Sequence, residues 1–347
     1  MPSGCLPARP VFEFLASADE GTRIWLDVLA VCQHEDNPAH KHDIAAFADV
    51  VAACSGGTLV VMDLTRCNPA TRAWCVFEWA HTLAAHGPDG LHMRLAPLER
   101  AAVFRDLDVE AAECFRPEDK QMIMREVRRQ HGSPEAFNSK LKLQLLLEPL
   151  SYSVDLRRLQ ERSADTEWEW APVEGWVEDA CMGRGGRALA VVSGAGEGKS
   201  TISAEMVRRL APTAGLGGGG GGSSYGAGVA LAYHFLKYND QRRLEPVRVI
   251  KSIAFQLATR LPAVCSSLMC LDVAEVAQLT DPGRAFELLL MRSLHGRTDP
   301  VVRAWARASR GGLGGEGGAT FWWGWGGVDG RADLVLRAGR LVAGAVV

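Results

Sequence analysis

The sequence predicts an α/β fold with two open, mainly parallel sheets flanked by helices. Short apolar runs rich in β-branched residues, at 23–31 and 57–64, have the composition of buried parallel strands, and the segment between them carries apolar residues at helical spacing. Further on, residues 189–210 read as a buried strand, a glycine loop and an amphipathic helix in that order. Such alternation of strands and helices is typical of this fold class.

Length and composition limit the classes of function. The chain has 347 residues, of which 47% are hydrophobic, enough for more than one buried core. A net charge of -3 with scattered basic residues gives no attraction toward nucleic acid, and no apolar run reaches the about 20 residues that a membrane helix needs. The 9 cysteines, an odd number without a signal-like N-terminus, indicate reduced thiols. We therefore expect a cytoplasmic protein that binds neither nucleic acid nor membranes.

Changes in composition predict the domain organisation. We expect an irregular segment at 1–22, an α/β domain at 23–150, a linker with a short helix at 151–183, a second α/β domain at 184–298 and a low-complexity Gly/Trp tail at 299–347. The second domain contains a Gly-rich insertion at 215–228. We expect this insertion and the tail to be disordered, because glycine-rich segments bury too little apolar surface to order the chain.

Several elements follow from hydrophobic spacing. In the first domain we expect a helix after Pro69 and mostly helical structure over 117–147. The apolar stripe of the helix after Pro69 is Cys75, Val76, Trp79 and Leu83. In the second domain we expect a strand at 229–235, a helix over 245–262 and another at 282–294. The helix over 245–262 has an apolar face with a polar edge at Gln256.

The glycine loop before the central helix has the chemistry of a phosphate site. Its glycines let backbone N–H groups surround an anion, and the following helix directs its positive end toward that anion. Lys199 suits the β- and γ-phosphates, and the Ser200 hydroxyl suits Mg²⁺. We expect ATP or ADP with Mg²⁺ to bind here. The predicted binding residues are Ser193, Gly194, Ala195, Gly196, Glu197, Gly198, Lys199, Ser200 and Thr201. Ser193 replaces the first glycine of the pattern G-x-x-x-x-G-K-[ST], so a glycine turn that binds nothing is the alternative.

Hydrolysis also requires an acid at the end of a second strand, where it helps to hold Mg²⁺. Asp272, behind the apolar run 268–271, is the approximate candidate, although it follows Pro262 closely and its surroundings read better as helix. We therefore expect weak hydrolysis or none.

The segments "VVSGAGEGKST", "ALAYHFLKYNDQRRLEPVRVIKSIAFQLATRLP" and "AFELLLMRSL" resemble the start of a NACHT-type P-loop domain of the STAND signalling ATPases, of the nephrocystin-3-like kind, over about 184–298. The resemblance implies a switch in which ADP holds a closed state and ATP an open one that self-associates or recruits protein partners. The family's acidic strand, sensor arginine and winged-helix region have no counterpart. This favours a partial domain, or a truncated gene product.

The segment "GTLVVMDLTRCNPATRAWCVFEWAHTL" resembles TIR domains, because Trp74, Cys75 and Glu78 match their Trp-Cys-x-x-Glu motif. The resemblance implies a flavodoxin-like domain in which Glu78 serves NAD cleavage, with NAD as a substrate. A carboxylate beside the ribose would stabilise an oxocarbenium-like transition state. On a helical wheel Glu78 lies off the apolar stripe, so a solvated carboxylate is the competing interpretation.

The leading hypothesis is a nucleotide-binding signalling switch of the NACHT type. An NAD-cleaving enzyme that uses Glu78 and a non-enzymatic scaffold or gene remnant are the alternatives.

Overall fold

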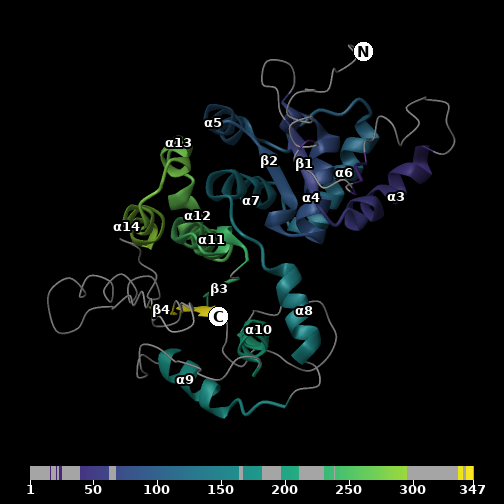
Figure 1. Ribbon diagram of the computed structural model, residues 1–347. Coiled ribbons are helices and arrows are strands. Elements are labelled where there is room, and N and C mark those ends of the chain that lie inside the picture. The colour runs from purple at the N-terminus through teal and green to yellow at the C-terminus, as the bar shows by residue number, and fades with distance from the viewer. Residues whose placement is uncertain are drawn as a thin grey trace. The chain divides into compact units, whose positions relative to one another are not determined.

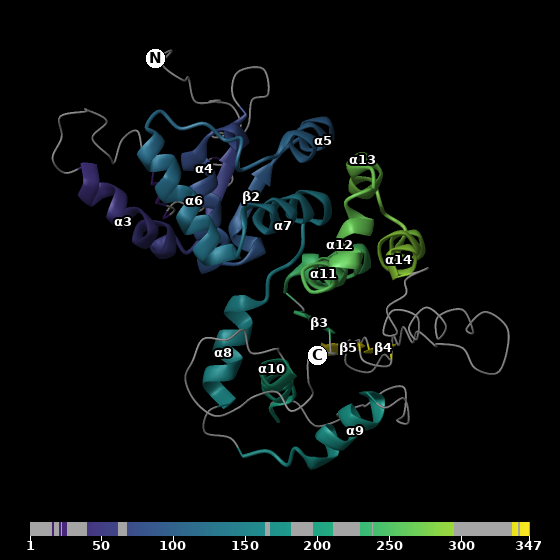
Figure 2. The same ribbon diagram turned by 180° about the vertical axis from the view of Figure 1, so that it is seen from behind.

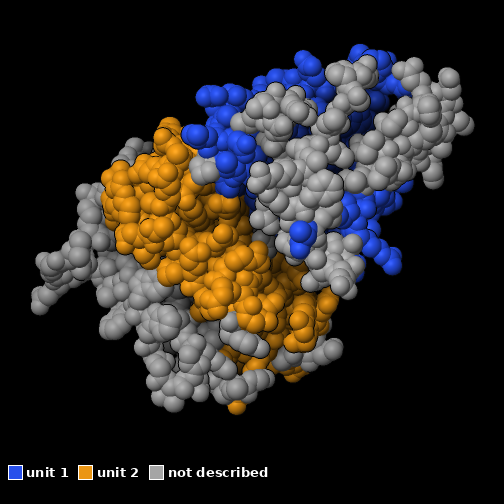
Figure 3. All heavy atoms as spheres, turned by 45° about the horizontal axis from the view of Figure 1, so that its top comes forward, with its two compact units in different colours: residues 1–145 blue, residues 146–347 orange. Residues whose placement is uncertain are grey.

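The computed structural model describes residues 16, 21, 23–25, 40–61, 68–163, 167–181, 197–210, 230–237, 239–294, 335–338 and 341–346. The chain divides into two compact units, residues 1–145 and 146–347 (Figure 3). Most of the predicted strand at 23–31 and the whole Gly-rich insertion at 215–228 lie outside the described residues. Among the helices that are described, none has both the length and the apolar character needed to cross a membrane.

Unit 1 contains a small parallel sheet. Strands β1 (Thr58–Val61) and β2 (Leu91–Arg94) pair in parallel, with Thr58 opposite Leu91. Helix α4 (Ala73–Ala85) contacts both strands and also packs against α3 (His40–Ala53) and α6 (Pro117–His131). Figures 1 and 2 show these three helices in the same part of the unit as the two strands. Strand β1, which lies within the predicted strand at 57–64, and the helix after Pro69 confirm the predictions for these two elements, whereas the partner strand β2 was not predicted. The predominance of helix around a small sheet agrees with an α/β fold in coarse form.

The core of unit 1 is built on α4. Its predicted stripe is confirmed, because Val76, Trp79 and Leu83 are all buried and Cys75 packs against the same cluster. The helix ends at Ala85, two residues before Gly87, whose φ of 72° is a conformation that suits glycine. Burial of this apolar face packs α4 against the neighbouring helices and strands of unit 1.

Shorter elements complete unit 1. The single-turn helices η1 (Pro69–Thr71) and η2 (Pro88–Gly90) precede α4 and β2 respectively. Helix α5 (Pro97–Asp106) follows β2, and α7 (Pro134–Leu147) follows α6. Helices α6 and α7 confirm the helical prediction for 117–147. The sequence pattern did not predict β2 and α5.

Unit 2 opens with helices that approach the glycine loop. Helix α8 (Ser153–Ser163) was not predicted, whereas α9 (Ala171–Cys181) confirms the short helix expected in the linker. Between them lies the approach segment, residues 167–170. Helix α10 (Lys199–Leu210) packs against α8. Their contact is part of a buried cluster made of Leu150, Tyr152, Ala204 and Phe235, with Leu156, Leu159, Val207 and Tyr233 packed around it.

The remaining helices of unit 2 follow strand β3 (Ala230–Phe235). They are η4 (Gln241–Arg243), α11 (Pro246–Ala258), α12 (Pro262–Leu268), α13 (Val273–Ala277), α14 (Pro282–Phe286), the π-helical η5 (Glu287–Met291) and α15 (Arg292–Leu294). The polar edge of α11 has a defined partner. The Gln256 amide accepts from the backbone N–H of Tyr233 at 3.0 Å and donates to its carbonyl at 2.8 Å. This pair of hydrogen bonds fixes α11 against β3.

Two further strands lie in the predicted tail. Strands β4 (Val335–Ala338) and β5 (Leu341–Val346) pair antiparallel, and β5 pairs in parallel with β3, with Ala230 opposite Leu341. The strand order is β3-β5-β4. The expectation of a disordered tail is therefore wrong for these two segments. Their Val-, Leu- and Ala-rich runs supply the apolar strand character that the glycine-rich composition of the whole tail obscures.

Candidate functional site beside helix α10

The described end of the glycine loop has the conformation that a tight turn into a helix requires. Gly198 has a φ of +84°, in the left-handed region that favours glycine. Helix α10 begins at the next residue, Lys199, and the Gly198 carbonyl accepts from Ile202 N–H at 2.9 Å. The predicted helix after the loop is thus confirmed. Of the predicted phosphate-binding residues, 197–201 are described and 193–196 lie outside the described part of the chain.

The start of α10 is held in place from its buried side. Ser203 Oγ donates to the Lys199 carbonyl at 2.8 Å, and Gln160 Nε2 on α8 donates to the Ala204 carbonyl at 3.3 Å. Both Ser203 and Ala204 are buried, whereas Lys199 and Ser200 are partly exposed. The first turn, with its partly exposed lysine and serine, therefore lies on a helix that α8 holds in place.

Trp168 of the approach segment lies against the last glycine of the loop. A Cβ atom at Gly198 would be 2.9 Å from Trp168 Cη2, closer than carbon atoms normally approach. Glycine at this position therefore meets two requirements, the positive φ and the close approach of the indole ring. The contact brings a residue 30 positions earlier in the sequence to the glycine loop.

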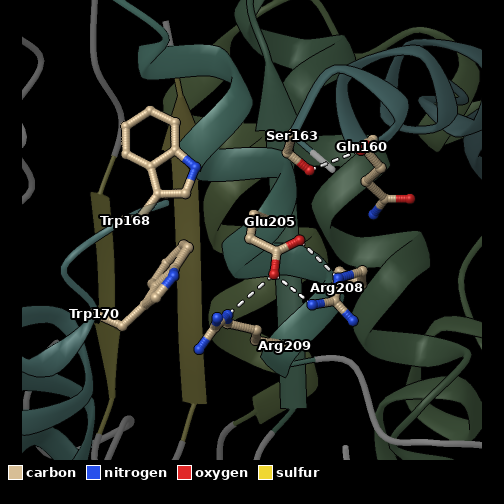
Figure 4. A pocket seen from close by; sticks show the side chains of 7 residues that line it. All are labelled: Gln160, Ser163, Trp168, Trp170, Glu205, Arg208 and Arg209. Carbon is tan, nitrogen blue, oxygen red and sulfur yellow. Dashed lines mark hydrogen bonds and ion pairs between the residues drawn. The ribbon is translucent and has the colours of Figure 1, made fainter. Parts of the chain in front are cut away.

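A cavity of about 350 Å³ lies next to this contact. Two tryptophans of the approach segment lie on one side of it, and side chains of α10 and the end of α8 lie across from them (Figure 4). The lining residues are Gln160, Ser163, Trp168, Trp170, Glu205, Arg208 and Arg209. Aromatic and charged side chains thus line one cavity beside the glycine loop.

The charges of the cavity are paired. The buried Glu205 carboxylate accepts from Arg208 Nε at 2.6 Å and from Arg209 Nε at 3.1 Å (Figure 4). Its bond to Arg208 lowers the pKa of Glu205 below the ordinary value, against the opposing effect of burial, so the carboxylate is ionised at neutral pH. Arg209 also reaches Glu174 on α9 at 3.2 Å and lies 4.1 Å above the centre of the Trp170 ring. These contacts bind α10 to the segment in front of the loop.

Trp168 carries an unpaired polar group at this site. Its indole Nε1 is buried, and no acceptor for it exists in the part of the chain that the structure describes. A buried N–H without a partner loses its hydration without compensation. The indole N–H of Trp168 is thus a buried donor without a partner among the described residues, shielded from solvent.

Sequence patterns did not identify this cavity. Trp168 and Trp170 stand in a polar linker, and Glu205, Arg208 and Arg209 have the spacing of ordinary surface ion pairs on a helix. The signal in the sequence was the pair of tryptophans in "EWEW", which are unusual in a solvated linker.

Asp272 does not lie at the end of a strand. Helix α12 precedes it, and Asp272 is the N-cap of α13, where its carboxylate accepts from the N–H groups of Ala274 at 2.6 Å and Glu275 at 3.3 Å. The helical interpretation of this region is confirmed. An aspartate is a favoured N-cap because its oxygen satisfies free N–H groups of the first turn, and this accounts for Asp272 without a metal.

Glu78 lies on α4 of unit 1, off the buried stripe as the helical wheel predicts. It is half-buried, and its backbone carbonyl accepts from Thr82 Oγ1 at 2.8 Å. The role in NAD cleavage stays a prediction from the TIR resemblance.

His234 on β3 is a core residue, as its position in an apolar strand indicates. Its ring nitrogens form hydrogen bonds with the Tyr152 hydroxyl and the Arg243 carbonyl. Burial lowers the pKa of His234 to about 4. It is therefore neutral at physiological pH.

A scan against protein-family models matched residues 169–299 to the family described as Nephrocystin 3, N-terminal. The matched range lies within unit 2 and contains the described end of the glycine loop, α10, β3 and the helices up to α15. It covers fewer than half of the residues, and it supports a NACHT-like, NTPase-related kind of domain for this part of the chain. Searches of curated proteins and of solved structures found no match.

Proposed function

We propose that the loop at 193–201 binds the phosphates of ATP or ADP together with Mg²⁺, and that unit 2 is a nucleotide-dependent signalling switch. The observation that carries this proposal is Gly198 in a left-handed conformation, followed at once by Lys199 and Ser200 in the first turn of α10. Such a turn directs backbone N–H groups and the positive end of the helix toward the same anion. Lys199 would pair with the β- and γ-phosphates, and Ser200 would ligate Mg²⁺.

The similarity to the nephrocystin-3 N-terminal family over 169–299 supports the same interpretation. The capping role of Asp272 leaves the acid needed for efficient hydrolysis without a candidate in the described residues. We therefore propose that the domain holds its nucleotide and turns it over slowly or not at all. The nucleotide that is bound would then determine whether the domain self-associates or binds protein partners.

The test is a titration of the purified chain with fluorescently labelled ATP in the presence of Mg²⁺. Lys199→Ala should weaken binding by about tenfold or more, because it removes a charge-assisted contact to phosphate. Lys237→Ala removes an exposed lysine from the same unit and should leave binding unchanged. Equal affinity of Lys199→Ala and the wild type would refute phosphate binding at this loop. Phosphate release measured on the same sample reports turnover separately.

A further inference from the structure

We propose that Arg209, in the last turn of α10, is a positioning residue for the glycine loop at the other end of the same helix. The approach segment transmits its effect, because this segment contacts Arg209 through one tryptophan and Gly198 through another. The proposal rests on the proposed function for the ligand of the loop. It adds a residue outside the loop that controls how well the loop binds phosphate and that couples this binding to α9.

Arg209 holds the approach segment and α9 together. Its guanidinium lies 4.1 Å above the centre of the Trp170 ring, and its Nη1 donates to the Glu174 carboxylate at 3.2 Å. Glu174 follows Trp170 by one helical turn, and its backbone N–H donates to the Trp170 carbonyl at 2.9 Å at the start of α9. One side chain therefore fixes both a ring of the approach segment and the first turn of the helix that follows it.

The guanidinium of Arg209 is itself oriented by α10. Its Nε donates to the buried Glu205 carboxylate at 3.1 Å (Figure 4). Glu205 lies one helical turn before Arg209, so this bond directs the arginine side chain back along α10 toward the N-terminus of the helix. Long side chains on helices favour this direction. Arg209 thus extends from the last turn of α10 toward the end that carries the glycine loop.

The two contacts of the approach segment join opposite ends of α10. Gly198 and Arg209 are 11 positions apart, which corresponds to about 16 Å at the rise of an α-helix. Trp168 and Trp170 are at most about 7 Å apart along the backbone. The two indole rings and the arginine side chain cover the rest of the distance. Trp168 is therefore anchored against Gly198 only as long as Arg209 anchors Trp170.

The contact with Trp168 bears on the conformation of the loop. Its ring packs against Gly198, whose φ is +84°, and the Gly198 carbonyl accepts from Ile202 N–H at 2.9 Å where the chain enters α10. Glycine has the most backbone freedom to lose, so a ring packed against it narrows the conformations of the turn. Loss of Arg209 should loosen this turn and raise the ordering cost of binding phosphate. By reciprocity, phosphate in the loop should strengthen the attachment of α9.

Hydrogen exchange of the Ile202 amide, measured on the full chain without ligand, tests the effect on the loop. Arg209→Ala should speed this exchange about fivefold to tenfold, because it removes a cation–π contact and the ion pair with α9. Arg208→Ala is the matched control. Within the described residues Arg208 binds Glu205 through two nitrogens and has no other hydrogen bond or ion pair. It should leave Ile202 exchange within about twofold of the wild type, and equal acceleration by both variants would overturn the proposal.

A double-mutant cycle tests whether the effect passes through the approach segment. Trp168→Ala should speed Ile202 exchange at least as much as Arg209→Ala, and the double variant should exchange within about twofold of Trp168→Ala. Additive effects would mean that the two side chains act independently and would overturn the proposal. If Arg209→Ala does not fold, Arg209→Lys decides, because it keeps the charge beside Glu205 but loses the planar group over Trp170. Unchanged Ile202 exchange in Arg209→Lys would then overturn the proposal.

Calorimetry with Mg-tripolyphosphate tests the consequence for binding. Arg209→Ala should lower the affinity about fivefold, whereas Arg208→Ala, which removes the same charge from the same turn, should leave it within about twofold. Faster Ile202 exchange in Arg209→Ala with unchanged tripolyphosphate affinity would overturn the role of Arg209 in binding and leave the phosphate site intact. Absence of tripolyphosphate binding by the wild type would refute the phosphate site, and the exchange of Ile202 would still decide whether Arg209 positions the loop.

Discussion

Gly198→Ala tests whether the turn into α10 depends on glycine for two separate reasons. At a φ of +84° an L-residue incurs about 1 to 2 kcal/mol of backbone strain. The new Cβ would also lie 2.9 Å from Trp168 Cη2 and 3.5 Å from Cζ2, whereas carbon contacts normally settle at about 3.5 to 4.0 Å. Displacing the indole adds an overpacking cost of about 1 to 3 kcal/mol. We expect the free energy of unfolding of unit 2 to fall by about 2 to 5 kcal/mol.

Gly132→Ala supplies the control for the backbone cost alone. Gly132 caps α6 with a φ of +85°, and within the described structure no neighbouring atom lies within 4 Å of the position that an alanine methyl group would take there. Its replacement should cost only the strain of the left-handed backbone, about 1 to 2 kcal/mol. The difference between the two alanine variants therefore measures the contact with Trp168.

The assay is urea unfolding followed by far-UV circular dichroism, with Trp168→Ala and the double variant completing a mutant cycle with Gly198→Ala. Removing the indole should recover the overpacking part of the loss, giving a coupling energy of about 1 kcal/mol or more. Equal losses in Gly198→Ala and Gly132→Ala, together with additive effects in the cycle, would refute the argument that Trp168 presses on the loop.

Two other predictions concern stability. Burial lowers the pKa of His234 from 6.5 to about 4, because the folded state favours the neutral ring. The contribution of His234 to the free energy of unfolding is therefore fully present above pH 6.5. It is lost as the pH falls toward 4, by up to about 3 kcal/mol. In urea titrations between pH 7 and 4, His234→Gln should reduce the loss of unfolding free energy with falling pH. The part due to His131, whose pKa burial also lowers to about 4, should remain. The same pH dependence of the unfolding free energy in His234→Gln and the wild type would contradict the prediction. Gln256→Leu should cost about 1 to 3 kcal/mol, because the backbone N–H and carbonyl of Tyr233 lose their partner. Gln121→Leu, on an exposed position of α6, is the control, and an equal effect of the two changes would refute the role of Gln256.

The spacing of apolar residues predicted those helices and strands whose pattern lies within one short stretch of sequence. The stripe of α4 around Trp79, the start of α10 after the glycines and the polar edge of α11 at Gln256 all follow from spacing within one helix. Strand β2 could not be found in this way, because its four residues, Leu-His-Met-Arg, contain no β-branched side chain. The pairing of β3 with β5 joins segments about 100 residues apart, and no local pattern encodes such a partner.

The cavity escaped prediction for a similar reason. The cavity forms because Trp168 and Trp170 contact α10, which follows about 40 residues later in the chain. From the sequence alone, the ion pairs of Glu205 have the spacing of ordinary surface pairs on a helix. The motif predicted the loop because its chemistry is contiguous in sequence. The surroundings of the loop depend on tertiary contacts that the motif does not contain.

The cluster of Leu150, Tyr152, Ala204 and Phe235 bears on where this domain can be cut for study. The family similarity begins at residue 169, and a fragment started there would lack α8 and Trp168. Ala204 and Phe235 would then lose the apolar side chains that shield them from water, and Gly198 would lose the indole at its back. A fragment that begins before Leu150 keeps this packing, so the unit that folds around the loop starts earlier in the chain than the region recognised by similarity.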